Sequence, residues 1–196
     1  MSLKGTKTIT TFIEWETFKS LIAKMERDKE YKFCLLISIG VFTALRISDL
    51  LTLKYSDILD KEILTITEHK TNKIRSIKLN ADLLALFNRI YPQLNVKDPN
   101  QLIFLNRFGT KAIDKSYVNV KLKEIFCTYK INLNGNISSH TFRKTLGRRI
   151  MQQNDYSNQF LILLSELFGH SSVGITRKYL GIQEKEIHSL YDCVSL

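Results

Sequence analysis

Residues 31–44 (YKFCLLISIGVFTA) are apolar on nearly every face of a helix, and this segment constrains the fold more than any other. A helix that is hydrophobic all round must be buried, so we expect other helices to surround it. Apolar residues at helical spacing predict such neighbours at 15–27, 81–91, 115–129 and 140–153. We predict helix starts at Asn80 and Asp114 and a helix stop at Asn154.

Two segments break the helical pattern. Residues 63–67 (ILTIT) and 74–79 (IRSIKL) are β-branched and roughly alternating, which predicts a β-hairpin. The polar stretch between them carries His69, Lys70 and Lys73. Shorter helices are expected at 48–54, with Ser48 as its cap, between Gly169 and Gly181, and at 183–192. The predicted fold is therefore mainly α with a small antiparallel β-sheet.

The chain has 196 residues and contains no repeat, low-complexity tract or Pro/Gly-rich linker. Its two prolines both fall in 91–100, the best loop candidate. We therefore predict a single domain over 1–196. Residues 1–3 are interpreted as an expression remnant, and 182–196 as a C-terminal tail that includes a helix.

Lys and Arg outnumber Asp and Glu by 29 to 19, which gives a formal net charge of +10. A charge this far from zero favours a polyanionic partner such as nucleic acid, although a merely basic protein would share it. The three cysteines have no paired spacing that suggests a metal site or a disulfide, which indicates a reducing compartment such as the cytoplasm. No apolar stretch approaches the roughly 20 residues that a membrane span requires.

Three segments contain residues suited to phosphate chemistry. In 43–51 (TALRISDLL), Arg46 is expected near a helix N-terminus, where a phosphate is readily bound. In 139–145 (SHTFRKT), His140 and Arg143 are three apart and share a helix face. In 167–179 (LFGHSSVGITRKY), His170 follows a glycine stop and Tyr179 ends the next short helix. Each segment alone is weak evidence for a catalytic site, because such residues are more often salt-bridge partners, structural histidines or packing aromatics.

In this order, and with a lysine on the hairpin, the set resembles the tyrosine recombinase (phage integrase) family over residues from about 12 to about 185. The resemblance implies the family's catalytic fold and a site-specific recombinase that cuts DNA through a 3′-phosphotyrosine. Lys70 matches the family's hairpin lysine, with Lys73 as the alternative. The implied catalytic residues are Arg46, Lys70, His140, Arg143, His170 and Tyr179.

By this resemblance, Tyr179 attacks a DNA phosphate whose non-bridging oxygens are held by the two arginines and His170. His140 accepts the phenolic proton or orients its acceptor, and Lys70 protonates the leaving 5′-oxygen. Neither ATP, a metal nor another cofactor is expected. The partners implied are double-stranded DNA and further copies of the chain in a tetramer. The segment 182–192 is equally compatible with docking onto a neighbour and with folding back onto its own domain.

The sequence departs from the family pattern in several places. Ala44 stands where glycine is frequent, Lys144 where histidine is frequent, and Phe168 where leucine is usual. Family members usually carry an N-terminal DNA-clamp domain, and we expect these 196 residues to lack it. A type IB topoisomerase and a non-catalytic DNA-binding module are the alternative functions. Further basic residues are candidates for contacts with the DNA backbone: Lys73, Arg75, Lys78, Arg148, Arg149, Arg177 and Lys178.

Overall fold

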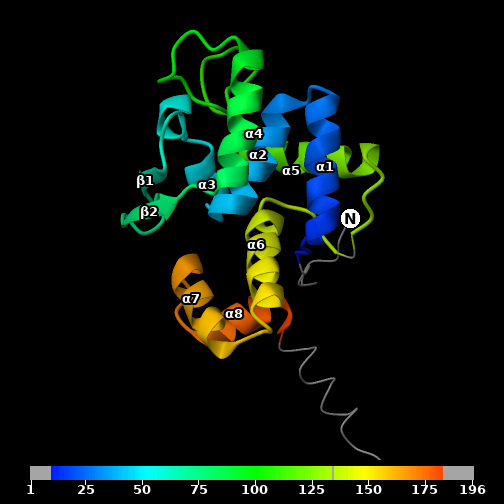
Figure 1. Ribbon diagram of the computed structural model, residues 1–196, viewed down its shortest axis with the longest axis vertical. Helices are drawn as coiled ribbons and strands as arrows, with labels where there is room; N and C mark the ends of the chain where they lie inside the picture. Colours follow the sequence, from blue (N-terminus) through cyan, green and yellow to red (C-terminus); the bar gives the residue numbers. More distant parts are fainter. Residues whose placement is uncertain (1–9, 134, 183–196) are drawn as a thin grey trace, which may run out of the picture.

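The computed structural model describes residues 10–133 and 135–182, which form a set of helices and one small antiparallel sheet (Figure 1). The first part comprises α1 (Trp15–Arg27), α2 (Tyr31–Thr43), α3 (Ile47–Leu50), β1 (Ile63–Thr67), β2 (Ile74–Lys78) and α4 (Ala81–Ile90). The second comprises α5 (Lys115–Thr128), α6 (His140–Gln153), α7 (Asn158–Phe168) and α8 (Val173–Leu180). Single 3₁₀ turns occupy Tyr55–Asp57 and Tyr91–Leu94. The predicted fold class is confirmed.

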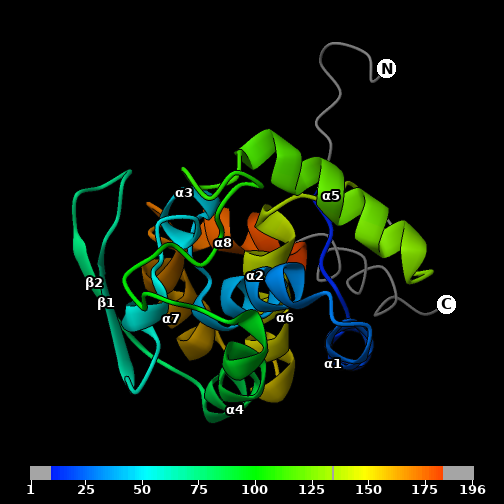
Figure 2. The ribbon, with the colours of Figure 1, turned by 90° about the horizontal axis from the view of Figure 1, so that it is seen from above.

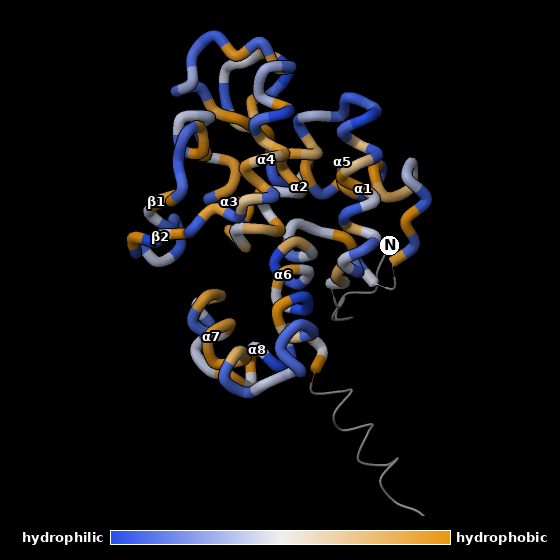
Figure 3. Tube along the Cα trace, viewed as in Figure 1, coloured by the Kyte–Doolittle hydropathy of each residue, from blue (hydrophilic) through white to orange (hydrophobic). Residues whose placement is uncertain are grey.

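As its composition predicts, α2 is the central helix and is buried along most of its length. It packs against α1, α4 and α6 (Figure 2). Cys34 is one of its fully buried residues. Hydrophobic residues concentrate around this helix, and a second group lies where α6, α7 and α8 meet (Figure 3). Because α6 contributes Phe142 to the first core and Met151 to the second, it joins the two.

The β-hairpin pairs Ile63 with Lys78 at its base and Thr67 with Ile74 near its turn. Leu64 and Ile77 form the buried face. Residues 68–73 connect the strands, and this turn begins at the edge of the candidate site.

The observed helices differ from the predicted ones in two places. First, α7 was not predicted at all, although Ser157 caps it by accepting a hydrogen bond from the amide of Gln159. Second, the helix expected at 48–54 spans only Ile47–Leu50, and its N-cap is Arg46 rather than Ser48. The starts at Asn80 and Asp114 and the stop at Asn154 are confirmed.

The expected helix at 183–192 and the interpreted remnant at 1–3 lie outside the described residues. Within the described ranges, no helix is long and apolar enough to cross a membrane.

Candidate active site

Arg46 lies at the junction of α2 and α3. The preceding helix ends at Ala44, whose φ of 50° is left-handed. This conformation suits glycine, which explains why glycine is frequent here in the family that the sequence resembles. The Arg46 side chain is 19% exposed. Its Nη1 donates to Oε2 of Glu68 at 2.8 Å, and its Nη2 donates to the carbonyl of Phe168 at 3.3 Å.

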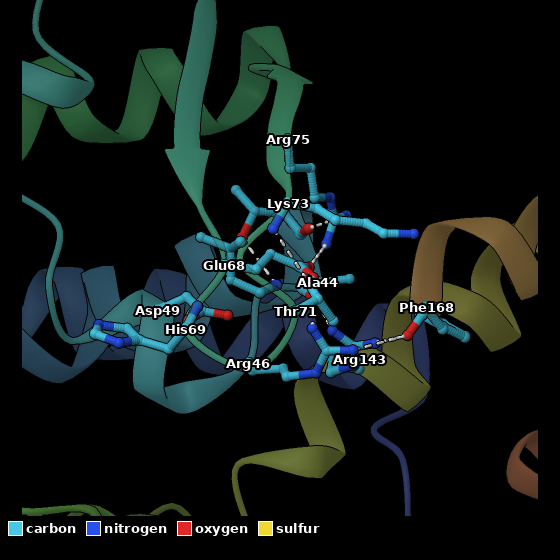
Figure 4. Close-up of polar contacts among 12 residues, drawn as sticks. Ala44, Arg46, Asp49, Glu68, His69, Thr71, Lys73, Arg75, Arg143 and Phe168 are labelled. Carbon is cyan, nitrogen blue, oxygen red and sulfur yellow. Dashed lines mark hydrogen bonds and ion pairs between the residues drawn. The ribbon is translucent and has the colours of Figure 1, made fainter. Parts of the chain in front are cut away.

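Arg143 lies in the first turn of α6 and is 5% exposed. Its Nη1 donates to the carbonyl of Ala44, and its Nη2 donates to the carbonyl of Phe168 at 2.9 Å. Arg46 and Arg143 therefore share one acceptor oxygen, although 97 positions separate them in the sequence (143 − 46). Figure 4 shows the two guanidiniums side by side. The predicted convergence of the two arginines is present.

The shared acceptor is the backbone of the last residue of α7. Terminal carbonyls of a helix lack partners within the helix and carry its partial negative charge. Gly169 ends this helix with a left-handed φ of 62°. A Cβ on Gly169 would lie 3.3 Å from Nη2 of Arg46. The left-handed backbone favours glycine here, and a Cβ would also press against the arginine.

Tyr179 lies in the last turn of α8, against the residues that follow α7. Its ring contacts that of His170 edge-on at 5.1 Å between centroids, and that of Phe168 at 5.5 Å. Burial raises the pKa of Tyr179 to about 12, despite the opposing charge and hydrogen bond of Arg143. The phenol is therefore protonated near neutral pH and lies within reach of Arg143.

The two histidines of the set occupy different positions. His170 is half-buried, and its Nδ1 lies 2.8 Å from Oγ1 of the fully buried Thr176. His140 begins α6, and its carbonyl, rather than its imidazole, accepts a hydrogen bond from the Tyr179 hydroxyl at 3.2 Å. Partial desolvation, and then neighbouring cations including Arg143, lower the pKa of both imidazoles, although His140 is exposed over much of its surface. Both rings are therefore neutral near pH 7.

Lys70 lies in the exposed hairpin turn, as does the alternative Lys73. Backbone and side-chain contacts fix this turn beside Arg46. The carboxylate of Asp49 accepts a hydrogen bond from the amide of His69 at 2.9 Å, and Glu68 starts the turn. The structure thus places the turn, rather than the Lys70 side chain itself, next to the other five residues.

Lys144, which replaces the frequent histidine, is buried with 6% exposure. Its Nζ donates to the carbonyl of Thr10 at 2.6 Å and lies 5.2 Å from the centre of the Tyr179 ring. An ammonium at this distance from an aromatic face attracts the ring. With lysine at this position in place of histidine, a positive charge lies against the Tyr179 ring.

Sequence reasoning missed the acidic residues of the site. Asp49 and Glu68 are 1% and 9% exposed, and both contact the turn that carries Lys70. Arg75, one of the candidates for a DNA-backbone contact, directs its guanidinium to the carbonyl of Thr43 and towards Glu68. Within 10–133 and 135–182, no three His, Cys, Asp or Glu side chains are grouped to hold a metal ion.

A mainly helical fold with a hairpin beside Arg46, and a tyrosine beside two convergent arginines, is the arrangement expected of a DNA-rejoining enzyme of the tyrosine type. Comparison with known proteins agrees. Residues 11–186 match the phage integrase family, and the chain belongs to it. The predicted family, catalytic fold and enzyme class, a tyrosine recombinase, are confirmed.

Individual relatives support the same assignment. The chain is 31% identical over 176 residues to the probable integrase/recombinase YoeC of Bacillus subtilis, covering 90% of this chain and 89% of that protein. It is 26% identical over 183 residues to the tyrosine recombinase XerH of Campylobacter jejuni, covering 90% of this chain but 49% of XerH.

Among solved structures, XerH bound to its palindromic difH substrate after cleavage matches with a TM-score of 0.68 and 22% identity. The match covers 98% of this chain and 55% of that one. The chain thus spans nearly all of YoeC but about half the length of XerH.

Proposed function

We propose that the chain is a site-specific DNA recombinase that breaks and rejoins strands through a 3′-phosphotyrosine on Tyr179. The observation that carries this proposal is the convergence of Arg46 and Arg143 on the carbonyl of Phe168, together with the contact of Tyr179 with Arg143 and with the Phe168 ring. A guanidinium has five N–H donors. Arg46 uses two of them in the bonds described, and Arg143 uses two for backbone carbonyls and one for Tyr179. Both arginines therefore retain donors for the oxygens of a phosphate.

In the proposed reaction, the phenolic oxygen of Tyr179 attacks phosphorus and displaces the 5′-oxygen of the next nucleotide. The two arginines stabilise the charge that builds on the non-bridging oxygens, and His170 adds a hydrogen bond. The phenolic proton passes to a base, a role that suits His140 because its lowered pKa keeps the imidazole neutral. Lys70 gives a proton to the leaving 5′-oxygen. Attack by a free 5′-hydroxyl on the phosphotyrosine reverses these steps and rejoins a strand.

The test is covalent capture on nicked DNA. The protein is incubated with a library of nicked duplexes of randomised sequence, in which cleavage near the nick releases a short fragment and prevents reversal. Denaturing electrophoresis should then show a DNA-linked protein band for the wild type and none for Tyr179→Phe. A wild-type protein that binds these duplexes without forming the band would refute the proposal and favour a non-catalytic DNA-binding module.

The same substrates separate the two enzymatic candidates. A recombinase cleaves a short defined sequence and joins two duplexes, whereas a type IB topoisomerase relaxes supercoiled plasmid with little sequence preference. We expect the sequences recovered from the covalent band to converge on one site. Relaxation of supercoiled plasmid together with unselected sequences would instead indicate a topoisomerase.

We further propose that the chain acts on double-stranded DNA in the cytoplasm as a tetramer. In sequence, Ile182, Ile187 and Leu190 have near-helical spacing, compatible with docking of this tail onto a neighbouring subunit. Sedimentation of the full chain and of a chain stopped after Gly181, with and without DNA, tests this arrangement. Association that is unchanged by the truncation in both states would exclude docking in trans.

A further inference from the structure

Glu68 connects two parts of the candidate site that are distant in sequence. It follows β1 directly and is 9% exposed. Its Oε2 accepts hydrogen bonds from Nη1 of Arg46 and from Oγ1 of Thr71, both at 2.8 Å (Figure 4). Its Oε1 lies 3.5 Å from Nη1 of Arg75. One carboxylate thus holds a phosphate-binding arginine and the residue that follows Lys70.

The backbone of Glu68 also closes the turn. Its amide donates to the carbonyl of Lys73 at 3.0 Å, and its carbonyl accepts from the amide of Asn72 at 2.9 Å. Residues 69–73 are exposed, so burial in a core does little to fix their conformation. The position of the Lys70 backbone therefore depends on the hydrogen bonds of the turn, and Glu68 makes several of them.

The charge of Glu68 argues against a role in attracting DNA. Burial alone would raise the pKa of Glu68, but hydrogen bonds from Thr71 and Arg46, and the charges of Arg46 and Arg75, lower it overall. The carboxylate is therefore ionised at neutral pH and repels a phosphate that approaches Arg46. A residue selected only for binding would not carry this charge, whereas a carboxylate suits the orientation of a guanidinium.

We propose that Glu68 is a positioning residue that orients Arg46 and fixes the turn bearing Lys70. It keeps the arginine that binds the phosphate and the lysine that protonates the leaving group in the relative positions that the reaction requires. This inference rests on the proposed recombinase function. It assigns to Glu68 no contact with DNA and no proton transfer.

The primary variant is Glu68→Ala, with Glu62→Ala as the matched control. Glu62 is an exposed residue of the same charge that precedes the same hairpin. Non-covalent affinity is measured in a Tyr179→Phe background, and single-turnover cleavage is measured at saturating DNA, on a duplex recovered from the nicked library. Thermal unfolding verifies that each variant folds.

We expect Glu68→Ala to bind DNA at least as tightly as the wild type, because a negative charge is removed. Its cleavage rate should fall roughly 10- to 100-fold, the scale of a misplacement of about 1 Å in a catalytic geometry. The Glu62→Ala control should match the wild type in cleavage. Cleavage by Glu68→Ala within about twofold of the wild type, or a defect confined to affinity, would overturn the inference.

Glu68→Gln tests whether geometry or charge is responsible. The amide oxygen can still accept from both Arg46 and Thr71, so this variant should recover most of the cleavage rate. A rate as low as that of Glu68→Ala would show that charge, not positioning, matters. Because Glu68→Gln keeps the size of the side chain, it also serves if the alanine variant does not fold.

A substrate with sulfur in place of the bridging 5′-oxygen separates the two positioned groups, because a thiolate leaves without protonation. We expect this substrate to restore Lys70→Ala fully but Glu68→Ala only in part, since Arg46 is also displaced. Full restoration of Glu68→Ala would overturn the assignment to Arg46. Failure of the wild type to cleave any duplex would instead refute the proposed function itself.

Discussion

Substitution of Thr176 by valine tests how the fold orients His170. The hydroxyl of Thr176 lies 2.8 Å from Nδ1 of the imidazole, and Thr176 is fully buried. Valine has nearly the same shape, so the packing of α8 is retained and only the hydrogen bond is lost. Because His170 is neutral, a hydroxyl that donates to Nδ1 leaves the proton on Nε2, which can then donate to a phosphate.

The magnitude follows from the environment of the bond. Leaving a buried polar group without a partner costs about 1–2 kcal/mol, and we expect this loss in the free energy of unfolding of Thr176→Val. If the misorientation of the ring costs a similar amount in the transition state, cleavage slows about tenfold, since about 1.4 kcal/mol corresponds to one factor of ten. Urea unfolding and single-turnover cleavage of a nicked duplex measure the two effects.

Thr176→Ser is the matched control. Serine keeps the hydroxyl and loses one buried methyl, so it should be destabilised by about 1 kcal/mol while its cleavage rate stays near that of the wild type. Equal cleavage rates for the valine and serine variants would refute the role of the hydroxyl in orienting His170.

Three further predictions concern packing and pH. Gly169→Ala should cost about 1 kcal/mol of stability and slow cleavage, because it strains a left-handed residue and moves Arg46; chemical unfolding and covalent capture measure both. Gly147→Ala should cost about 1–3 kcal/mol in thermal unfolding, since its Cβ would lie 2.7 Å from the packed side chain of Leu180. Because the pKa of His140 and of His170 is lowered in the folded state, the unfolded chain takes up protons first as the pH falls below about 6.5. Stability in urea should therefore decrease from about pH 7 to about pH 5, and less so in a variant lacking both imidazoles.

The sequence predicted the parts of this fold that have local signatures. The apolar segment 31–44 became the buried α2, and the alternating segments became the hairpin. By contrast, α7 was missed because its apolar run 160–164 (FLILL) is only five residues long, and periodicity cannot distinguish so short a run from a buried strand. The residues predicted for the site needed an ordered set of motifs, because each motif alone has a more common structural explanation.

Asp49 and Glu68 belong to no sequence pattern by which their roles could be recognised. Asp49 lies in a short helix, where a carboxylate is usually a solvated surface group, and Glu68 lies in a polar hairpin turn. Their roles depend on partners brought close by tertiary structure, such as Arg46 beside Glu68 and the amide of His69 beside Asp49. A sequence pattern that records only spacing along the chain cannot identify them.

The missed helix explains how two arginines of like charge can lie side by side. Like charges repel, and both guanidiniums are largely buried, so each requires a compensating acceptor. The carbonyl of Phe168, at the negative end of α7, accepts from both Arg46 and Arg143. The site therefore uses the end of one helix as a neutral acceptor shared by two cations, and Glu68 supplies a full negative charge to only one of them. Among its described hydrogen bonds, Arg143 has two backbone carbonyls and the Tyr179 side chain as partners, so none of them brings it a full negative charge.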